Sequence, residues 1–257
     1  MGNGWISKKL KSFHQTGRKS VALLLDPDNI TNESAFRKMV ELAFSLKVDF
    51  FLMGGILVTT DIMYRSISII KSLNDQVPVI LFPGNSIQLV DNADGILFLS
   101  LISGRNPDLL IGQHILAAPF LAKSKLEVLP TGYMLVDSGQ ITSVNYISQT
   151  LPLPYDKPDL AIATALAGTL LGLQYLFLDA GSGAQRPVSP EIIAAVKKHT
   201  QCPILVGGGI DSSLKAKNAW ESGADVVVLG NGVEKKPGLL TEVLSIAHIY
   251  NLSLNVN

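Results

Sequence analysis

Two aspartates follow an apolar run near the N-terminus, in the sequence LLLDPDN. Asp26 and Asp28 stand where a buried strand over residues 20–26 would end. Mg²⁺ takes one or two such carboxylates together with phosphate oxygens and water, so a magnesium site is one interpretation. The other is a turn in which Asp28 or Thr31 caps the helix that begins in NESAFRKMV. The sequence favours a functional role for Asp26 and leaves both interpretations open for Asp28.

A third aspartate, Asp179, ends another apolar run and precedes a Gly-Ser-Gly turn. It stands in YLFLDAGSGA, and two more glycine turns, GGGI and LGNGV, follow later in the chain. Glycine lets backbone N–H groups approach an anion closely, so this set of turns predicts a site for a small phosphate group. Ser182 adds a hydroxyl donor. Because lysine and arginine are sparse in these turns, we expect the backbone to bind the phosphate.

Short apolar runs along the whole chain must position these residues. They are continuous rather than alternating, which indicates parallel strands that are covered on both faces. Eight strand–helix units in about 250 residues predict a single (β/α)8 TIM barrel, in one domain over residues 1–257. A doubly wound sheet is the alternative. The runs are residues 20–26, 48–55, 77–84, 93–101, 130–139, 173–183, 202–210 and 224–232.

In such a barrel, the carboxyl ends of the strands meet at one rim, where active sites lie. The turns after strands seven and eight often bind phosphate in this fold, and GGGI and LGNGV occupy those two places. Between the fifth and sixth strands, Pro152, Pro154 and Pro158 predict a proline-rich loop. A helix should begin after that loop, at Asp159.

The composition excludes several classes of protein. Charged residues make up 16% and the formal net charge is zero, so nothing calls for a nucleic-acid partner. The single cysteine, Cys202, predicts a buried thiol and a reducing compartment. No run approaches ~20 apolar residues, so we expect a cytoplasmic protein without a transmembrane helix. No zinc-site spacing occurs, and we expect structural or exposed roles for the histidines, His14, His114, His199 and His248.

The order of these motifs resembles that of the geranylgeranylglyceryl phosphate synthase family, in its longer archaeal and Bacteroidetes-like branch. The resemblance implies a Mg²⁺-dependent prenyltransferase of phospholipid biosynthesis. In that reaction the C3 hydroxyl of sn-glycerol 1-phosphate attacks C1 of geranylgeranyl diphosphate and displaces diphosphate. It also implies a homo-oligomer and a transient approach to the membrane. The sequences that carry the resemblance are LLLDPDN, PVILFPGN, SLISGRNP, PTGYMLVDSG, TALAG, YLFLDAGSGA, VGGGI and LGNGVE.

The resemblance further implies roles for individual residues. Asp179 would accept or orient the proton of the glycerol hydroxyl, with Tyr133 close to the glycerol. Asp26 matches a Mg²⁺ ligand, and Arg105 is a candidate donor to the leaving diphosphate. The positions that match glycerol phosphate binding are Phe177, Leu178, Asp179, Ala180, Gly181, Ser182, Gly183, Gly208, Gly209, Gly230 and Asn231.

Two positions depart from the family pattern. Ile56 stands where a Ser or Thr usually supplies a second Mg²⁺ ligand, and its side chain cannot coordinate a metal. The metal would then rest on Asp26, water and either Thr59 or a backbone carbonyl. Asp179 stands where a glutamate is frequent, which is one methylene longer.

Three other functions stay open at this point. One is heptaprenylglyceryl phosphate synthesis, which uses a longer prenyl donor. Another is a phosphate-binding isomerase with Asp26 and Asp179 as an acid–base pair. The third is a weakly active barrel that binds phosphate or lipid, because Ile56 replaces a ligand. The sequence does not define the length of the prenyl chain.

Overall fold

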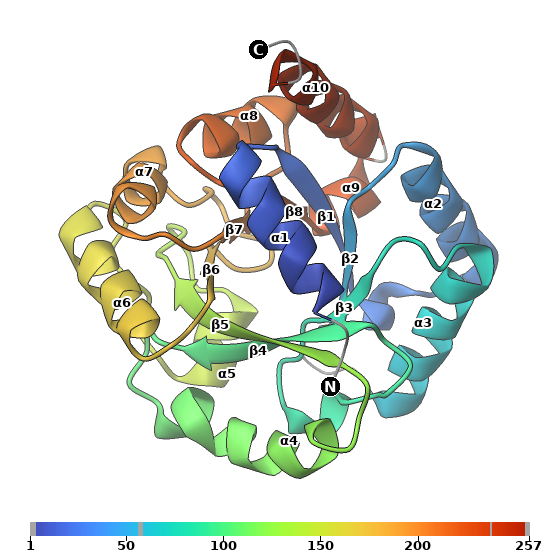
Figure 1. Ribbon diagram of the computed structural model, residues 1–257, viewed down its shortest axis with the longest axis horizontal. Coiled ribbons are helices and arrows are strands. Elements are labelled where there is room, and N and C mark those ends of the chain that lie inside the picture. The colour runs from blue at the N-terminus through green and yellow to red at the C-terminus, as the bar shows by residue number, and fades with distance from the viewer. Residues whose placement is uncertain (1–3, 56–58, 237, 255–257) are drawn as a thin grey trace.

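The strands of the computed structural model, which describes residues 4–55, 59–236 and 238–254, close into one parallel barrel (Figure 1). Their spatial order follows the chain from β1 to β8, and β8 pairs back with β1. This confirms the predicted TIM barrel. The strands are β1 (Ser20–Leu25), β2 (Phe50–Met53), β3 (Val79–Leu81), β4 (Gly95–Leu101), β5 (Glu127–Leu135), β6 (Tyr175–Asp179), β7 (Ile204–Gly207) and β8 (Val226–Leu229).

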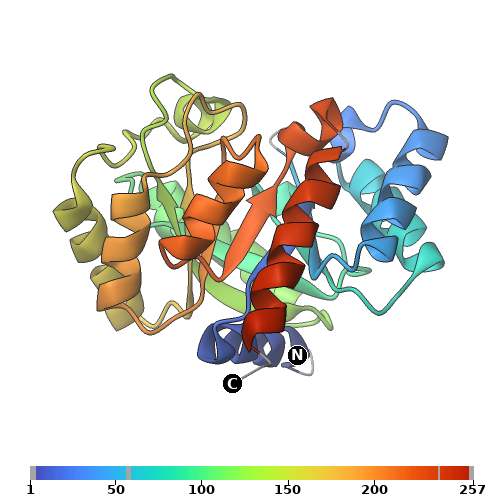
Figure 2. The same ribbon diagram turned by 90° about the horizontal axis from the view of Figure 1, so that it is seen from above.

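An outer layer of helices covers the barrel (Figures 1 and 2). In α2, the buried residues Phe36, Val40 and Ala43 recur every three or four positions and turn one apolar face to the strands. The helix predicted after the proline-rich loop is α6, which begins at Pro158. The outer helices are α2 (Glu33–Ser45), α3 (Thr60–Leu73), α4 (Gln113–Leu121), α6 (Pro158–Leu170), α7 (Pro190–His199), α8 (Ser213–Glu221) and α10 (Gly238–Leu254).

Helix α1 (Trp5–Thr16), which the sequence did not predict, lies across the amino-terminal end of the barrel (Figures 1 and 2). Ile6 and Leu10 are buried and belong to the same apolar cluster as the inside of the barrel. The Glu127 carboxylate, at the start of β5, accepts hydrogen bonds from the backbone N–H groups of Ile6 and Ser7. Among the described residues, helix α1 therefore covers this end of the barrel.

The fifth unit differs in two places from its prediction. Strand β5 begins at Glu127, three residues before the predicted start, and it contains Pro130. Pro130 has no N–H to donate, yet its carbonyl still accepts a hydrogen bond from the N–H of Gln174, so the pairing continues. The following loop also carries a short helix that was not predicted, α5 (Ser143–Ser148).

The interior has two layers because alternate residues of each strand face opposite sides. Val21 and Leu23 of β1 pack toward the helices, whereas Ala22 joins the cluster inside the barrel. Cys202 is buried, as predicted. Within the described ranges, no helix is long and apolar enough to cross a membrane.

Candidate active site

A cavity of about 810 Å³ opens at the carboxyl ends of the strands. Each strand or the turn that follows it contributes to its wall, from Leu24 in β1 and Asp26 after β1 to Val228 in β8. Its volume lies within the range of roughly 300–1,000 Å³ that is usual for small-molecule sites. The polar strand ends predicted from the sequence therefore surround one cavity.

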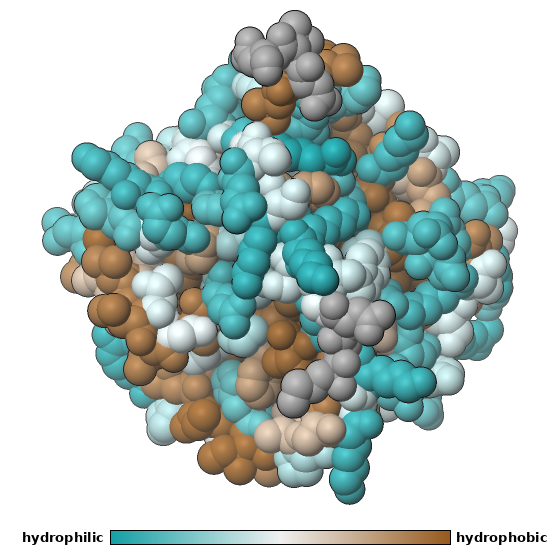
Figure 3. Space-filling model, in the orientation of Figure 1, coloured by the Kyte–Doolittle hydropathy of each residue, from teal (hydrophilic) through white to brown (hydrophobic). Residues whose placement is uncertain are grey.

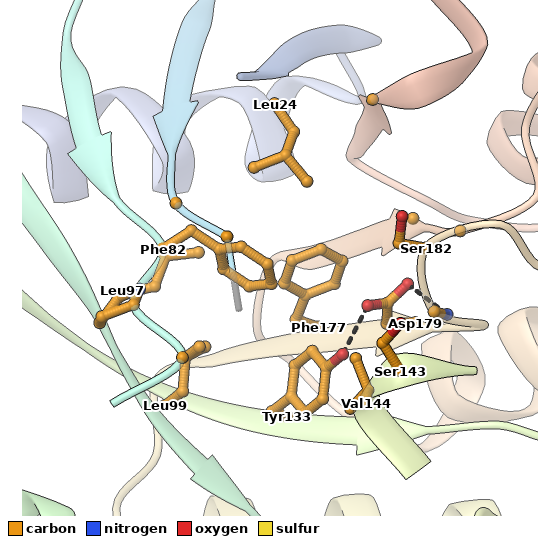
Figure 4. A pocket seen from close by; sticks show the side chains of 18 of the residues that line it. Leu24, Phe82, Leu97, Leu99, Tyr133, Ser143, Val144, Phe177, Asp179 and Ser182 are labelled. Atoms are coloured by element: carbon orange, nitrogen blue, oxygen red, sulfur yellow. Dashed lines mark hydrogen bonds between the residues drawn. The ribbon is translucent and has the colours of Figure 1, made fainter. Parts of the chain in front are cut away.

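A buried tyrosine–aspartate pair forms part of the wall of this cavity (Figure 4). The hydroxyl of Tyr133 donates to Asp179 Oδ2 at 2.5 Å, and the Gly181 N–H donates to Asp179 Oδ1 at 2.8 Å. Strand register explains the meeting: Tyr133 pairs with Phe177, and Asp179 lies two residues further on the same face of β6. Both side chains are less than a tenth exposed.

The environment of this pair changes the pKa values of both groups. Burial raises the pKa of Asp179, and the hydrogen bonds from Tyr133 and Gly181 act in the opposite direction. Burial and the neighbouring carboxylate together raise the pKa of Tyr133 well above its usual range. Tyr133 consequently keeps its proton and donates it to the hydrogen bond. Asp179 is a stronger proton acceptor than an aspartate in water.

Aromatic and aliphatic side chains form the apolar wall of the cavity (Figure 4). The ring of Phe177 lies 5.2 Å from that of Phe82 and 5.6 Å from that of Tyr133, measured between centroids. Leu97 and Leu99 of β4 and Val144 of α5 continue this wall. Such a surface suits a hydrocarbon ligand, and it adjoins the tyrosine–aspartate pair directly.

Three glycine turns form the opposite wall, which we call the glycine cradle: residues 181–183, 208–209 and 230–231. Gly208 has φ +79°, and a Cβ atom there would lie 2.6 Å from Asp179 Oδ1, so this close approach requires glycine. Asn231 Nδ2 donates to Ser182 Oγ at 2.8 Å and ties the turn after β8 to the turn after β6. The structure thus brings the predicted phosphate turns together.

Two residues of the predicted set lie behind this wall. Leu178 and Ala180 are buried in the layer between strands and helices and do not line the cavity. Phe177 and Asp179 alternate with them along β6 and do line it. The period of two in a strand accounts for this split.

The acidic rim is formed by Asp26 and Asp28, which both line the cavity. Asp26 Oδ1 accepts a hydrogen bond from the Asp28 N–H, and burial raises the pKa of Asp26. Helix α2 is capped by Asn32, whose side chain accepts from the Ala35 N–H. The alternative in which Asp28 or Thr31 caps this helix is therefore wrong.

The donor chemistry at this rim fits a magnesium ion. Carboxylate oxygens of Asp26 and Asp28 are hard ligands, and Mg²⁺ needs only one or two of them when phosphate oxygens and water complete its shell. No group of three or more His, Cys, Asp or Glu side chains suited to a metal occurs in the described part of the chain.

Ile56, the position of the second metal ligand in the family pattern, lies outside the described residues. Thr59 is exposed before α3 and is not part of the cavity wall.

Arg105 is another predicted site residue that does not line the cavity. Its side chain is exposed, and its guanidinium donates to the Gly104 carbonyl at 2.7 Å within its own loop.

Among the wall residues that the sequence did not assign to the site, two carry titratable nitrogen groups, His114 and Lys235. His114 of α4 lies edge-on to Phe98, burial lowers its pKa, and its Nδ1 is buried without a hydrogen-bond partner among the described residues. Lys235 lies in the turn after β8. Only its spacing, one helical turn after Asn231, could have indicated that it faces the site.

Comparison with known proteins identifies related chains. A model of the PcrB family matches residues 14–247. A geranylgeranylglyceryl phosphate synthase of Spirosoma linguale is 54% identical, over 95% of this chain and 98% of the relative. The enzyme of that name from Thermococcus gammatolerans is 37% identical, over 90% of this chain and 88% of the relative.

Solved structures extend this comparison. The crystal structure of (S)-3-O-geranylgeranylglyceryl phosphate synthase from Thermoplasma acidophilum, in complex with its substrate sn-glycerol-1-phosphate, superposes with a TM-score of 0.85 at 28% identity. The match covers 92% of this chain and 96% of that one. A thiamine phosphate pyrophosphorylase from Pyrococcus furiosus, at 14% identity and a TM-score of 0.57, shares the fold alone.

Proposed function

This chain belongs to the PcrB family, and from that premise we propose that it joins sn-glycerol 1-phosphate to geranylgeranyl diphosphate through an ether bond. One observation carries the proposal: the buried Tyr133–Asp179 pair lies between a glycine cradle and an apolar wall. A reaction that links a small phosphate to a hydrocarbon chain needs both surfaces at one reactive group. The substrate bound to the Thermoplasma acidophilum relative and the names of the relatives support the same reaction.

Asp179 is the general base of the proposed reaction. The C3 hydroxyl of sn-glycerol 1-phosphate donates its proton to the Asp179 carboxylate as its oxygen forms a bond to C1 of the prenyl chain. The bond between C1 and the diphosphate oxygen breaks, and the diphosphate leaves with the bonding electrons. Tyr133 orients Asp179 through its hydrogen bond to Oδ2. The proton ends on Asp179, so atoms and charges balance.

The apolar wall has a second role beside binding the chain. It excludes water from C1, where positive charge develops as the diphosphate departs, and so prevents hydrolysis of the donor. The rings of Tyr133 and Phe177 also attract positive charge through their faces.

A bound Mg²⁺ is part of the proposal. Asp26 and Asp28 would hold it, and when bound it would neutralise the charge that develops on the leaving diphosphate. Their carboxylate oxygens and their position on the cavity wall support this assignment. Titration of activity with Mg²⁺ in an Ile56→Ser variant tests it further. A lower Mg²⁺ requirement than in the unchanged protein would show that the missing hydroxyl limits metal binding.

The remaining parts of the proposal concern assembly. A homo-oligomer is supported by exposed apolar side chains on α4 and α6, such as Leu116 and Leu170. Figure 3 shows hydrophobic residues along the part of the surface that corresponds to these helices. The cytoplasmic location and the transient approach to a membrane stay predictions.

Incubation of the purified protein with labelled sn-glycerol 1-phosphate and a series of prenyl diphosphates tests the function. We expect an ether product with the twenty-carbon donor when Mg²⁺ is present. The enantiomer, sn-glycerol 3-phosphate, is the matched control and should react far more slowly. No ether with any donor would contradict the proposal, and a preference for a thirty-five-carbon donor would favour heptaprenylglyceryl phosphate synthesis.

A further inference from the structure

The charge of the cavity wall does not match the proposed substrates by itself. Both substrates carry phosphoryl groups, and the binding of two anions in one cavity requires positive charge or hydrogen-bond donors. Of the described residues that line the cavity, Lys235 alone is a lysine or arginine. The aspartates of the wall are Asp26, Asp28, Asp108, Asp179 and Asp211.

Several of these carboxylates already accept hydrogen bonds or form ion pairs within the chain. Asp211 forms an ion pair with Lys215 at 2.9 Å, and Asp108 accepts a hydrogen bond from Gln113. Asp179 is engaged by Tyr133 and Gly181. Among the described residues, only Asp211 of this set pairs with a cation, and two of the remaining carboxylates, Asp26 and Asp28, lie on the side proposed to hold Mg²⁺. The glycine cradle has no charged side chain of its own. Arg186 follows Gly183 by three residues, but it pairs with Asp137 at 2.6 Å and does not line the cavity, whereas Lys235, four residues after Asn231, does line it.

Helix geometry directs Lys235 toward the cradle. The short helix α9 spans Asn231–Lys235, so Lys235 follows Asn231 by four residues and lies on the same face, one turn away. Asn231 is fixed to Ser182 by a hydrogen bond. Lys235 is exposed, and no hydrogen bond or ion pair engages its ammonium among the described residues. The next residue, Lys236, differs: its Nζ pairs with Glu242 at 3.2 Å, and it does not line the cavity.

We propose that Lys235 binds the phosphate group of sn-glycerol 1-phosphate and holds that substrate in the glycine cradle. The inference rests on the proposed function and assigns a substrate-binding residue to it. Backbone N–H groups of the cradle supply shape and direction, whereas the flexible lysine supplies the full positive charge. Because the phosphate lies at the opposite end of the glycerol from the attacking C3 hydroxyl, Lys235 affects binding more than chemistry.

Steady-state kinetics of Lys235→Met and Lys236→Met test the assignment. Both variants remove one charge from adjacent surface positions, so the second is a matched control. For Lys235→Met we expect the KM for sn-glycerol 1-phosphate to rise about tenfold, the usual loss for one charge-assisted contact. The kcat and the KM for the prenyl diphosphate should change less than about twofold, and Lys235→Arg should recover most of the affinity. Lys236→Met should match the unchanged protein.

Two results would overturn the assignment. One is an unchanged KM for sn-glycerol 1-phosphate in Lys235→Met. The other is a rise in the KM for the prenyl diphosphate alone, which would place the lysine on the diphosphate.

Calorimetric binding of sn-glycerol 1-phosphate, without any prenyl donor, separates this inference from the proposed function. If the unchanged protein binds the phosphate more tightly than Lys235→Met but forms no ether, the function fails and the inference holds. If the two proteins bind it equally, the inference fails whether or not the ether forms.

Discussion

The two ends of the barrel both bury aspartates, but they surround them differently. At the amino-terminal end, Asp225 accepts a hydrogen bond from Lys197 Nζ at 2.9 Å and lies 3.0 Å from His14 Nδ1. At the carboxyl end, the donors to Asp179 are the hydroxyl of Tyr133 and the N–H of Gly181, which are both neutral. Asp225 is therefore held in an ion pair, whereas Asp179 has only neutral donors and a raised pKa, which suits a group that accepts a proton.

A shifted pKa does not distinguish the two ends by itself. Burial raises the pKa of Asp49, at the amino-terminal end, just as it raises that of Asp179. The difference lies in what opposes the shift: Arg18 and Lys9 lower the pKa of Asp49 through their charges, and no cation does so for Asp179. The charge of the groups that contact a buried carboxylate is therefore a better criterion for a reactive group than the direction of its pKa shift.

The largest expected effect is on catalysis, in Asp179→Asn. The amide cannot accept the proton of the C3 hydroxyl, so kcat should fall about 10³-fold. The free energy of unfolding should not fall, because the raised pKa means that the ionised carboxylate destabilises the fold at neutral pH. Single-turnover rates and denaturant melts measure the two quantities. Activity within tenfold of the unchanged protein would remove Asp179 from the role of base.

At the amino-terminal end, Asp225→Ala should have the opposite effect: a loss of stability without a loss of activity. It removes the partner of Lys197 and the acceptor for the Ile204 N–H, and leaves buried polar groups unpaired. The free energy of unfolding should fall by about 3 kcal/mol. Below the melting transition, kcat and both KM values should stay within twofold. A loss of activity without a loss of stability would contradict the assignment of this end to structure.

The same comparison shows what the sequence could predict. Continuous apolar runs indicated a parallel barrel, and in that topology the turns containing Asp179, Gly208 and Asn231 must converge. No side-chain geometry was needed for this result, which is why the convergence of these turns could be predicted, while their binding of phosphate stays a prediction. The roles of Arg105 and Lys235 depended on which way each side chain turns within its loop. Spacing along the chain gives little information on that direction.

The end that α1 covers was harder to predict for a related reason. Helix α1 has a lysine-rich sequence in which Ile6 and Leu10 are its buried residues, so its apolar face is narrow. Its contacts lie far away in the chain: Glu127 is 121 residues from Ile6, and Asp49 is 40 residues from Lys9. Contacts between residues so far apart leave no pattern in the local sequence. The sequence near the amino terminus therefore did not indicate a helix that covers the barrel.

A smaller effect is expected from the loss of a single hydroxyl, in Tyr133→Phe. Asp179 must be ionised to accept a proton, so activity falls as the pH drops through its pKa. The Tyr133 hydrogen bond lowers that pKa, and its loss should move the acidic limb of kcat/KM to higher pH. The rate at the optimum should fall roughly tenfold because Asp179 is less well oriented.

Tyr175→Phe is the matched control for this variant. Tyr175 is also buried, but its hydroxyl donates to Ser7 Oγ at the end of the barrel that α1 covers. Its pH profile should coincide with that of the unchanged protein. Equal shifts in both variants would mean that the hydroxyl of Tyr133 acts through general stability rather than through Asp179.

The smallest effect is expected from Glu127→Gln. The two carboxylate oxygens of Glu127 accept from the Ile6 and Ser7 N–H groups, in the first turn of α1, where a negative charge also stabilises a helix. Glutamine keeps one acceptor and loses the charge, so the free energy of unfolding should fall by about 1 kcal/mol. Hydrogen exchange of the first-turn amides should accelerate, while kcat and both KM values stay unchanged. If this substitution reduced kcat instead, a change in the packing of α1 would have to alter the position of Asp179 through the barrel. The stability of one end and the catalysis at the other would then not be independent.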